Sequence, residues 1–152
     1  MRRTISISAA ATMALASTLT VGAPASAATP SLRFHGAQYD APGTDTSHDN
    51  SLNAEWISLI NSGSRAVNLN GYTVRDAAGH VHTFRNTTIA ADGGRIWLHT
   101  GMGIAAGRNV FWGSSAHIWN NTGDRATLRN ASGTTLDTCS WRSKANRTWV
   151  AC

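Results

Sequence analysis

Short runs of β-branched, aliphatic and aromatic residues alternate with clusters of Gly, Asn, Asp and Ser along most of the chain. Runs of this kind, bounded by turn-forming residues, predict short β-strands. The predicted strands cover residues 33–39, 55–60, 67–75, 80–84, 95–99, 110–112, 126–129, 134–138 and 148–151. No segment shows a convincing helical period, and a parallel sheet would need crossover connections of about a dozen residues. The pattern therefore predicts an all-β, antiparallel fold, either a sandwich or a small barrel.

Two segments with the same pattern, TVRDAAG at 73–79 and TLRNASG at 127–133, predict β-hairpins. In each, an alternating strand leads into Asp76 or Asn130, whose side chain can accept hydrogen bonds from the backbone of a turn. The closing glycine supplies the positive φ that a bulged hairpin requires. Since good hairpin turns resemble one another, we do not interpret two copies as an internal repeat.

The N-terminal residues have the layout of an export signal. Arginines at positions 2 and 3 precede an apolar run at 5–21, and small residues at positions 25 and 27 suit a signal peptidase. The apolar run is short for a membrane span, which needs about 20 strongly apolar residues. We therefore expect a cleaved signal peptide at 1–27, rather than a retained membrane anchor, followed by one domain at 28–152. This predicts a secreted, extracellular protein with no membrane span in its mature part.

The positive charge of the chain is smaller in the predicted mature domain. The formal net charge of the whole chain is +5 at pH 7. Removal of the predicted signal peptide takes away Arg2 and Arg3 and lowers this charge by two, to +3. So modest a charge is a weak basis for nucleic-acid binding, which we keep as an alternative but do not favour.

Two cysteines, Cys139 and Cys152, lie in the predicted mature domain. An even pair of cysteines in an exported protein indicates a disulfide. The bridge would close a short C-terminal loop and stabilise the fold by about 3 kcal/mol. Two free thiols are the alternative, but they would need a reducing compartment, and no CxxC of a metal site occurs.

Several strand and turn motifs follow one another in a specific order and spacing. They are YDAPGTD at 39–45, EWISLIN at 55–61, VNLNGYTVRD at 67–76, Phe84, Ile89, the turn at 91–94, RIWL at 95–98 and WNNTGDRATL at 119–128. Together they resemble the lamin tail domain family over about residues 33–141, and the opening motif is similar to that of small secreted bacterial members. The resemblance implies an immunoglobulin-like β-sandwich, and it implies no enzyme.

The chain contains six tryptophans. A row of exposed rings would suggest a sugar-binding face, because flat aromatic rings stack on pyranoses. Core packing is the better explanation for the four that lie in strand runs beside aliphatic or aromatic residues, namely Trp56, Trp97, Trp112 and Trp119. We therefore predict core positions for these four. Trp141 and Trp149 lie within the loop that the disulfide would close, and they are the candidates for exposed positions.

Aromatic and cationic residues alternate in the segment SWRSKANRTW at 140–149, inside the loop that the disulfide would close. Such interleaving fits a carbohydrate or an anionic polymer. The alternative is a solvated hairpin in which arginine stems cover the indole rings. The candidate ligand-binding residues are Trp141, Arg142, Lys144, Arg147 and Trp149.

Acidic residues gather in the loop before the second predicted strand. Asp40, Asp45 and Asp49 offer oxygen ligands for calcium, although their spacing is not that of an EF-hand. A Pro-Gly turn with solubilising acids is the simpler interpretation. If these carboxylates converged with Glu55 and a histidine in a cleft, they would instead indicate a small secreted hydrolase or nuclease.

The sequence lacks a convergent set of reactive residues. Glu55 is the one glutamate, and no Gly-x-Ser-x-Gly elbow occurs. His80 and His82 would share one face of a strand, but no third zinc ligand can be named. We therefore predict a non-catalytic, monomeric interaction module without a cofactor or a metal, which binds an unknown extracellular or cell-surface partner.

Overall fold

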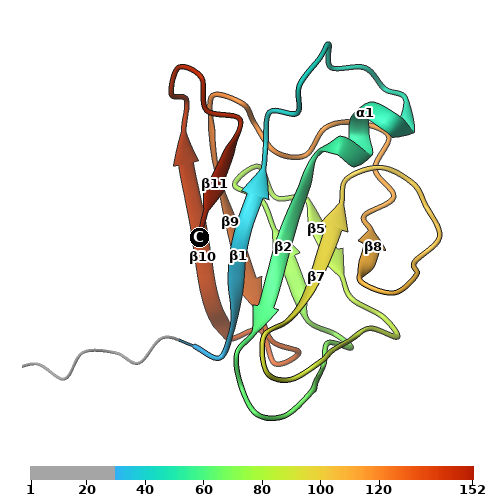
Figure 1. Cartoon of the computed structure of the whole chain (residues 1–152), viewed down its shortest axis with the longest axis vertical. Coiled ribbons are helices and arrows are strands. Elements are labelled where there is room, and N and C mark those ends of the chain that lie inside the picture. Colours follow the sequence, from blue (N-terminus) through green and yellow to red (C-terminus); the bar gives the residue numbers. More distant parts are fainter. Residues whose placement is uncertain (1–29) are drawn as a thin grey trace, which may run out of the picture.

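The structure of the chain is a computed structural model that describes residues 30–152. The predicted signal peptide at 1–27 lies outside these residues. The described part contains one short helix and eleven strands (Figure 1). In chain order they are β1 (Leu32–Gln38), α1 (Asp49–Ala54), β2 (Trp56–Asn61), β3 (Val67–Asn68), β4 (Thr73–Arg75), β5 (Val81–Thr83), β6 (Thr88–Ile89), β7 (Gly94–His99), β8 (Asn109–Phe111), β9 (Gly123–Arg129), β10 (Thr135–Arg142) and β11 (Trp149–Ala151).

Two sheets form the layers of a sandwich (Figure 1). The first has five strands in the order β11-β1-β2-β7-β8, and the second has four in the order β10-β9-β4-β5. A small ribbon of β3 and β6 stands beside them. The fold is therefore the predicted all-β, immunoglobulin-like sandwich.

The core lies between the two large sheets, and strand alternation decides which side chains enter it. Ile57 and Leu59 of β2 are fully buried, and so are Val74 of β4 and Leu128 of β9 in the other sheet. Aromatic rings fill the space between these aliphatic layers, namely those of Phe34, Tyr39, Phe84, Trp119 and Trp141. Burial of each such large side chain contributes about 1.5–3 kcal/mol to folding.

Both predicted hairpins are present. Asp76 follows β4, and its Oδ1 accepts hydrogen bonds from the backbone N–H groups of Gly79 and His80, each at 2.7 Å. Asn130 follows β9, and its Oδ1 accepts hydrogen bonds from the backbone of Ser132 and Thr134. The glycine that closes each turn has a positive φ, 106° at position 79 and 84° at position 133. The local turn chemistry therefore folds as predicted.

The strand predicted over 67–75 is interrupted. Its first part, β3, pairs with β6, a strand that the sequence analysis did not predict. Between β3 and β4 the chain turns at Gly71, where φ is 78°. The side chain of Asn68 stabilises this turn by accepting a hydrogen bond from the backbone of Asn70. A short turn thus divides a run that looks like one continuous strand.

Two expectations about the chain path were wrong. Strand β8 pairs with β7 in parallel, and the connecting residues 100–108 contain no crossover helix. In addition, residues 49–54 form α1, whose one buried residue is Leu52. A helix of this length is too short to show a hydrophobic period. None of the helices within residues 30–152 has the length and apolar character to cross a membrane.

Candidate functional site

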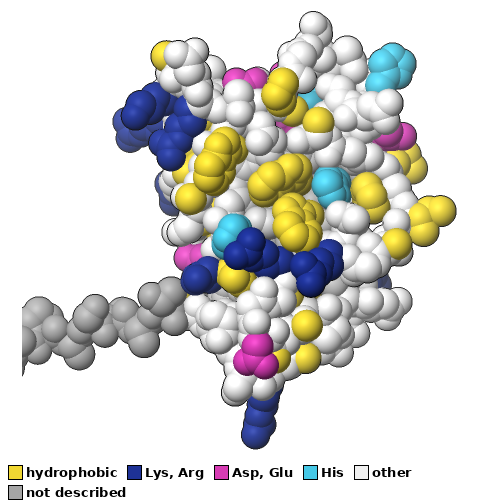
Figure 2. All heavy atoms as spheres, in the orientation of Figure 1, with side chains coloured by type: hydrophobic (Ala, Val, Ile, Leu, Met, Phe, Trp, Pro, Cys, Tyr) yellow, Lys and Arg dark blue, Asp and Glu magenta, His cyan; other side chains and the backbone are white. Residues whose placement is uncertain are grey.

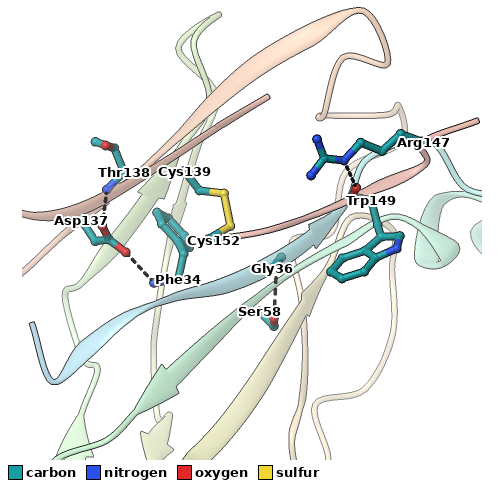
Figure 3. Close-up of a disulfide and its surroundings, with 9 residues drawn as sticks. All are labelled: Phe34, Gly36, Ser58, Asp137, Thr138, Cys139, Arg147, Trp149 and Cys152. Atoms are coloured by element: carbon teal, nitrogen blue, oxygen red, sulfur yellow. Dashed lines mark hydrogen bonds between the residues drawn. A yellow bond between two sulfur atoms is a disulfide. The ribbon is translucent and has the colours of Figure 1, made fainter. Parts of the chain in front are cut away.

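The predicted disulfide is present and links the two sheets. Cys139 lies in β10 of the four-stranded sheet, and Cys152 follows β11 of the five-stranded sheet. Their Cα atoms are 5.5 Å apart. Figure 3 shows the bridge at one end of β11 and, at the other end, the hydrogen bond from Arg147 to Trp149. The disulfide therefore fastens the short edge strand that carries Trp149.

The exposed position predicted for Trp141 was wrong, because its side chain is buried at 6% exposure. Its ring stacks on that of Tyr39 at 5.2 Å, and its indole N–H donates a hydrogen bond to the carbonyl of Asn120. Trp149 is 52% exposed, as predicted. It lies on the edge strand of the other sheet, so the two rings do not form one exposed pair.

The cationic candidates lie at a shallow hollow of about 400 Å³ beside the C-terminal hairpin. Arg142, Lys144 and Arg147 line it and are exposed. Trp141 forms part of its wall, whereas Trp149 is not among the lining residues. The structure thus separates the predicted site into a cationic hollow and a tryptophan on a different surface.

A row of side chains rich in aromatic rings crosses the outer face of the five-stranded sheet. Trp149 of β11 lies opposite Gln38 of β1, which lies opposite Trp56 of β2. Trp56 lies opposite His99 of β7, which lies opposite Phe111 of β8. The rings of His99 and Phe111 stack, with their centroids 5.4 Å apart. These five residues are called the aromatic row below.

The aromatic row faces solvent because its neighbours along the strands face the core. Ala37, Ile57 and Leu98 are buried, so the alternate positions on β1, β2 and β7 point to the other side of the sheet. Figure 2 shows hydrophobic side chains grouped over the middle of this sheet, with histidine beside them and Lys or Arg side chains below. The sandwich thus presents a partly apolar outer surface on this side.

Two further rows complete the outer face. The middle row consists of Ala151, Gly36, Ser58, Trp97 and Asn109. The next consists of Arg33, Ile60 and Arg95 and is called the arginine row. Along the strands the order is therefore the aromatic row, then the middle row with its small residues, then the arginine row with its guanidinium groups.

The core positions predicted for Trp56 and Trp97 were therefore wrong. Both side chains are half-buried, and both occupy outward positions on their strands. Trp119 is buried as predicted, and Trp112 packs against the core from its edge. Aliphatic neighbours in sequence do not place a tryptophan in the core, because adjacent strand residues point to opposite faces.

Basic groups crowd together at the arginine row. Arg33 and Arg95 flank Ile60 on the neighbouring strands, which places their Cα atoms about 10 Å apart. Burial lowers the pKa of His35, and the charges of Arg95 and Arg33 lower it further. Within residues 30–152, the cation of every ion pair is a histidine, so neither arginine has a carboxylate partner there. The arginine row is an uncompensated positive patch.

Only two of the three aspartates of the acidic loop lie close together. Asp40 and Asp45 both accept hydrogen bonds from the side-chain amide of Asn121, at 3.1 and 3.2 Å. Asp49 lies elsewhere and accepts a hydrogen bond from the backbone of Met102. The calcium candidate Asp40, Asp45 and Asp49 is therefore not one three-ligand cluster. In residues 30–152, no group of three or more His, Cys, Asp or Glu residues could hold a metal ion.

Ser51, His117 and Glu55 lie in the order of a hydrolase relay. Ser51 Oγ is 3.4 Å from His117 Nε2, and His117 Nδ1 is 3.3 Å from Glu55 Oε2. Both distances exceed the roughly 2.6–3.2 Å of a nucleophile paired with its base. Asp45 also approaches Nε2, at 3.8 Å, and Ser51 Oγ accepts a hydrogen bond from the backbone of Thr46. This network joins two loops and α1 to the start of β2.

Glu55 itself serves the structure. Its Oε1 accepts hydrogen bonds from the hydroxyl of Thr100 and from the backbone N–H groups of Ile118 and Trp119. Burial raises the pKa of this carboxyl group. A carboxylate so fully engaged by the fold is poorly placed to act on a substrate. The sequence indicates Glu55 only as a conditional catalytic group, and no local pattern predicts this anchoring role.

The two histidines considered for zinc have separate surroundings. His80 Nδ1 lies 2.6 Å from Asp76 Oδ2, in the hairpin turn. His82 lies in β5, and its ring contacts those of Phe84 and Trp112, with centroid distances of 4.9 and 5.6 Å. They form no shared metal site.

Replacing His82 with phenylalanine is expected to make the fold less sensitive to acid. Burial lowers the pKa of His82 from 6.5 to about 4. The neutral ring therefore stabilises the fold fully above pH 6.5, and this contribution is lost as the pH falls toward about 4. With allowance for partial exposure of the ring, the loss is on the order of 2 kcal/mol. Urea unfolding at neutral and at acidic pH measures it.

The exposed His48 offers a control for this experiment. His48→Gln removes an imidazole that has no side-chain hydrogen bond in residues 30–152 and should leave the acid sensitivity unchanged. If His82→Phe lost as much stability between the two pH values as the wild-type protein, burial of His82 would not be the cause.

Comparison with known families agrees with this architecture. A family model described as Lamin Tail Domain matches residues 25–143, which is most of the chain. No curated protein matches the chain. The match includes all elements from β1 to β10, whereas β11 with Trp149 and Cys152 lies beyond it. The lamin tail domain is a non-enzymatic, immunoglobulin-like fold, and the chain belongs to this family.

Proposed function

We propose that this protein is a small, secreted, non-catalytic binding module that attaches to an extracellular or cell-surface partner through the outer face of its five-stranded sheet. The aromatic row is the observation that carries this proposal. Exposed aromatic rings grouped on one face of a small protein mark interaction surfaces. Here the rings of Trp149, Trp56 and Phe111 come from three different strands; Trp149 is exposed, and the other two are half-buried.

The roles of two buried carboxylates support a binding role. Glu55 is held by three hydrogen bonds from the surrounding backbone and Thr100. Asp124, another buried carboxylate, accepts hydrogen bonds from the backbone of Ala77, Asn120 and Arg125. Carboxylates engaged in this way stabilise loops, and they leave ligand contact to side chains on the surface.

Secretion is supported by the layout of residues 1–27 and by the disulfide. A Cys139–Cys152 bridge persists in an oxidising compartment and is rarely kept in the cytosol. The proposed mature domain begins at Ala28 and is expected to be a monomer.

The cationic hollow is a second candidate surface. Arg142, Lys144 and Arg147 line it without a carboxylate partner in residues 30–152. Its one tryptophan, Trp141, is buried and stacked on Tyr39, so the hollow offers charge but little aromatic area. A polyanion would bind there through charge alone, with a strong dependence on salt.

Export of the full chain from a bacterial host and binding by the exported product test the proposal. The product is expected to begin at Ala28. Labelled protein is applied to insoluble cell-wall polysaccharides, single-stranded DNA and immobilised proteins, and it is incubated with chromogenic glycosides and phosphodiesters. We expect retention by at least one of these materials and no turnover. The double variant Trp56→Ala, Trp97→Ala should lose most of the retention.

Matched variants assign the surface. Arg142→Gln with Lys144→Gln should leave retention unchanged, because these residues lie at the hollow and not on the outer sheet face. Turnover that persists after further purification would overturn the non-catalytic role. Retention that survives loss of both tryptophans but not of the two cations would move the site to the hollow.

A further inference from the structure

We propose that the outer face of the five-stranded sheet binds an acidic polysaccharide, whose sugar rings stack on the aromatic row and Trp97 while its carboxylates pair with Arg33 and Arg95. This inference rests on the proposed function and names the ligand class of the same surface. It is carried by the placement of aromatic, small and basic side chains in three parallel rows.

The aromatic row has the dimensions of an extended sugar chain. It crosses five strands, and neighbouring strands lie about 4.8 Å apart, so it is about 19 Å long. Trp56 lies two strands from Trp149 on one side and two strands from Phe111 on the other, at about 10 Å in each case. Rings spaced in this way can stack on alternate sugars of one chain that runs across the strands, and at the β8 end His99 and Phe111 form one stacked pair.

Polar side chains lie between and beside the rings. Gln38 separates Trp149 from Trp56, and Asn109 lies next to Trp97 in the middle row. Gln38 Nε2 donates a hydrogen bond to the carbonyl of Asp40, and Asn109 Oδ1 pairs with His99 Nε2. The other amide atoms, Gln38 Oε1 as an acceptor and Asn109 Nδ2 as a donor, suit the hydroxyl groups of a sugar. A protein partner of ordinary affinity buries about 800 Å² on each side around an apolar centre. A row one residue wide, with an amide between its rings, fits a narrow polymer better.

The middle row has small residues beside Trp97. Gly36 and Ser58 lie between Trp97 and the β11 edge, and the hydroxyl of Ser58 donates a hydrogen bond to the Gly36 carbonyl. A Cβ atom at Gly36 would lie 2.9 Å from the carbonyl oxygen of Val150, so a larger residue there would push on β11. Gly36 and Ser58 are both buried, Ser58 at 1% exposure, so they form a closed floor beneath the neighbouring side chains, and ligand contact falls to the larger residues around them.

Charge complementarity selects an acidic ligand. The guanidinium groups of Arg33 and Arg95 lack a carboxylate partner within residues 30–152, and His35 stands beside them. All eight acidic residues of the chain lie at positions outside the three rows. Guanidinium groups bind carboxylates through paired hydrogen bonds. A polymer that carries carboxylates along its length would relieve the repulsion between these basic groups.

Binding to acidic polymers and to their neutral esters tests the inference. The exported protein is titrated with polygalacturonate, alginate and hyaluronan, each beside a derivative whose carboxylates are methyl-esterified. We expect it to bind at least one acidic polymer, and to bind the matching ester at least tenfold more weakly. The preference for the acidic form should weaken as salt is added.

Two sets of variants separate stacking from charge. Arg33→Gln with Arg95→Gln should reduce the affinity for the acidic polymer to that for the ester and leave ester binding unchanged. Trp56→Ala with Trp97→Ala should weaken both at least tenfold, whereas Trp56→Phe with Trp97→Phe should keep most of the affinity. The control is Arg75→Gln with Arg125→Gln on the four-stranded sheet, which should change neither affinity.

Several results would overturn the inference. Binding of none of the three acidic polymers would do so, and so would equal affinity for acid and ester. If the control pair of arginine variants lost as much affinity for the acidic polymer, the preference for the acidic form would come from the net charge of the protein and not from the arginine row. If the protein instead binds single-stranded DNA more tightly than every polysaccharide and loses this binding in the same variants, that result would replace the ligand class and leave the proposed function unchanged. If the tryptophan variants unfold, as seen by near-UV circular dichroism, the arginine variants alone decide.

Discussion

Replacing Glu55 with alanine is expected to lower the free energy of unfolding by about 4 kcal/mol. Its Oε1 accepts the Thr100 hydroxyl at 2.6 Å and the N–H groups of Ile118 and Trp119 at 2.9 and 3.2 Å. Alanine would leave these three donors without an acceptor in a buried place, at about 1–3 kcal/mol for each fully buried donor. Urea unfolding followed by tryptophan fluorescence measures the difference between the two proteins.

Glutamine at the same position is the matched control. It keeps an oxygen where Oε1 accepts its hydrogen bonds, so we expect a loss of about 1 kcal/mol or less. Thr100→Val, which removes one of the three donors, should fall between the two Glu55 variants. A Glu55→Gln protein as unstable as Glu55→Ala would show that charge, and not the acceptor, holds this loop.

The pH dependence of the free energy of unfolding, compared between the wild-type protein and Glu55→Gln, gives an independent check. Burial raises the pKa of Glu55 above 4.5, so the folded protein favours the protonated carboxyl group. The resulting contribution to stability is fully present below pH 4.5 and is lost as the pH rises through the raised pKa. Glu55→Gln has no such loss. The free energy of unfolding of this variant should therefore rise relative to that of the wild-type protein as the pH rises from about 4 to about 8.

Local patterns were sufficient to predict the hairpins. The determinants of each turn, an Asp or Asn followed three residues later by Gly, lie within one short segment, and the structure forms them as expected. The parallel pairing of β7 and β8 depends instead on the path of residues 100–108. That path is fixed by contacts between distant residues, such as the hydrogen bond from the backbone of Trp97 to Arg108. No local sequence pattern predicts this parallel pairing.

The positions of the tryptophans were partly legible in the sequence. In RIWLH at 95–99, Trp97 is two residues from both Arg95 and His99, so its side chain points to the same face of the strand as these polar residues. This indicates an outward position. In TCSWR at 138–142, Trp141 is two residues from Cys139, and a cysteine that bridges two sheets faces the core. Strand alternation therefore predicts the side of each ring better than the apolar neighbours of Trp97 or the position of Trp141 inside the disulfide loop.

The aromatic row could not have been predicted in the same way. It exists only because the register places Trp149, Gln38 and Trp56 side by side. These residues are far apart in the chain, and a shift of one residue between β1 and β2 would send the row into a different arrangement. The bulge between Phe34 and Gly36 helps to set this register, and it has no clear sequence signal.

Removing the disulfide is expected to lower the free energy of unfolding by about 3 kcal/mol. The bridge joins residues separated by 13 positions, and in the chain-entropy model it restricts the unfolded chain by about this amount. The test compares the urea midpoint of the Cys139→Ser, Cys152→Ser variant with that of the wild-type protein. Dithiothreitol should bring the wild-type protein to the level of the variant and leave the variant unchanged.

The loss should also appear locally at the end of the aromatic row. Strand β11 is a short edge strand, and the backbone N–H of Cys152 donates a hydrogen bond to the carbonyl of His35 in β1. Without the bridge, this N–H and that of Val150 should exchange with solvent faster than amides of β2 in the centre of the sheet. Equal protection of β11 in both proteins would show that pairing with β1 and the hydrogen bond from Tyr39 to Arg147 suffice to hold Trp149 in the row. Faster exchange would make the disulfide a condition for the binding surface as well as for stability, since Trp149 can extend the row only while β11 stays paired.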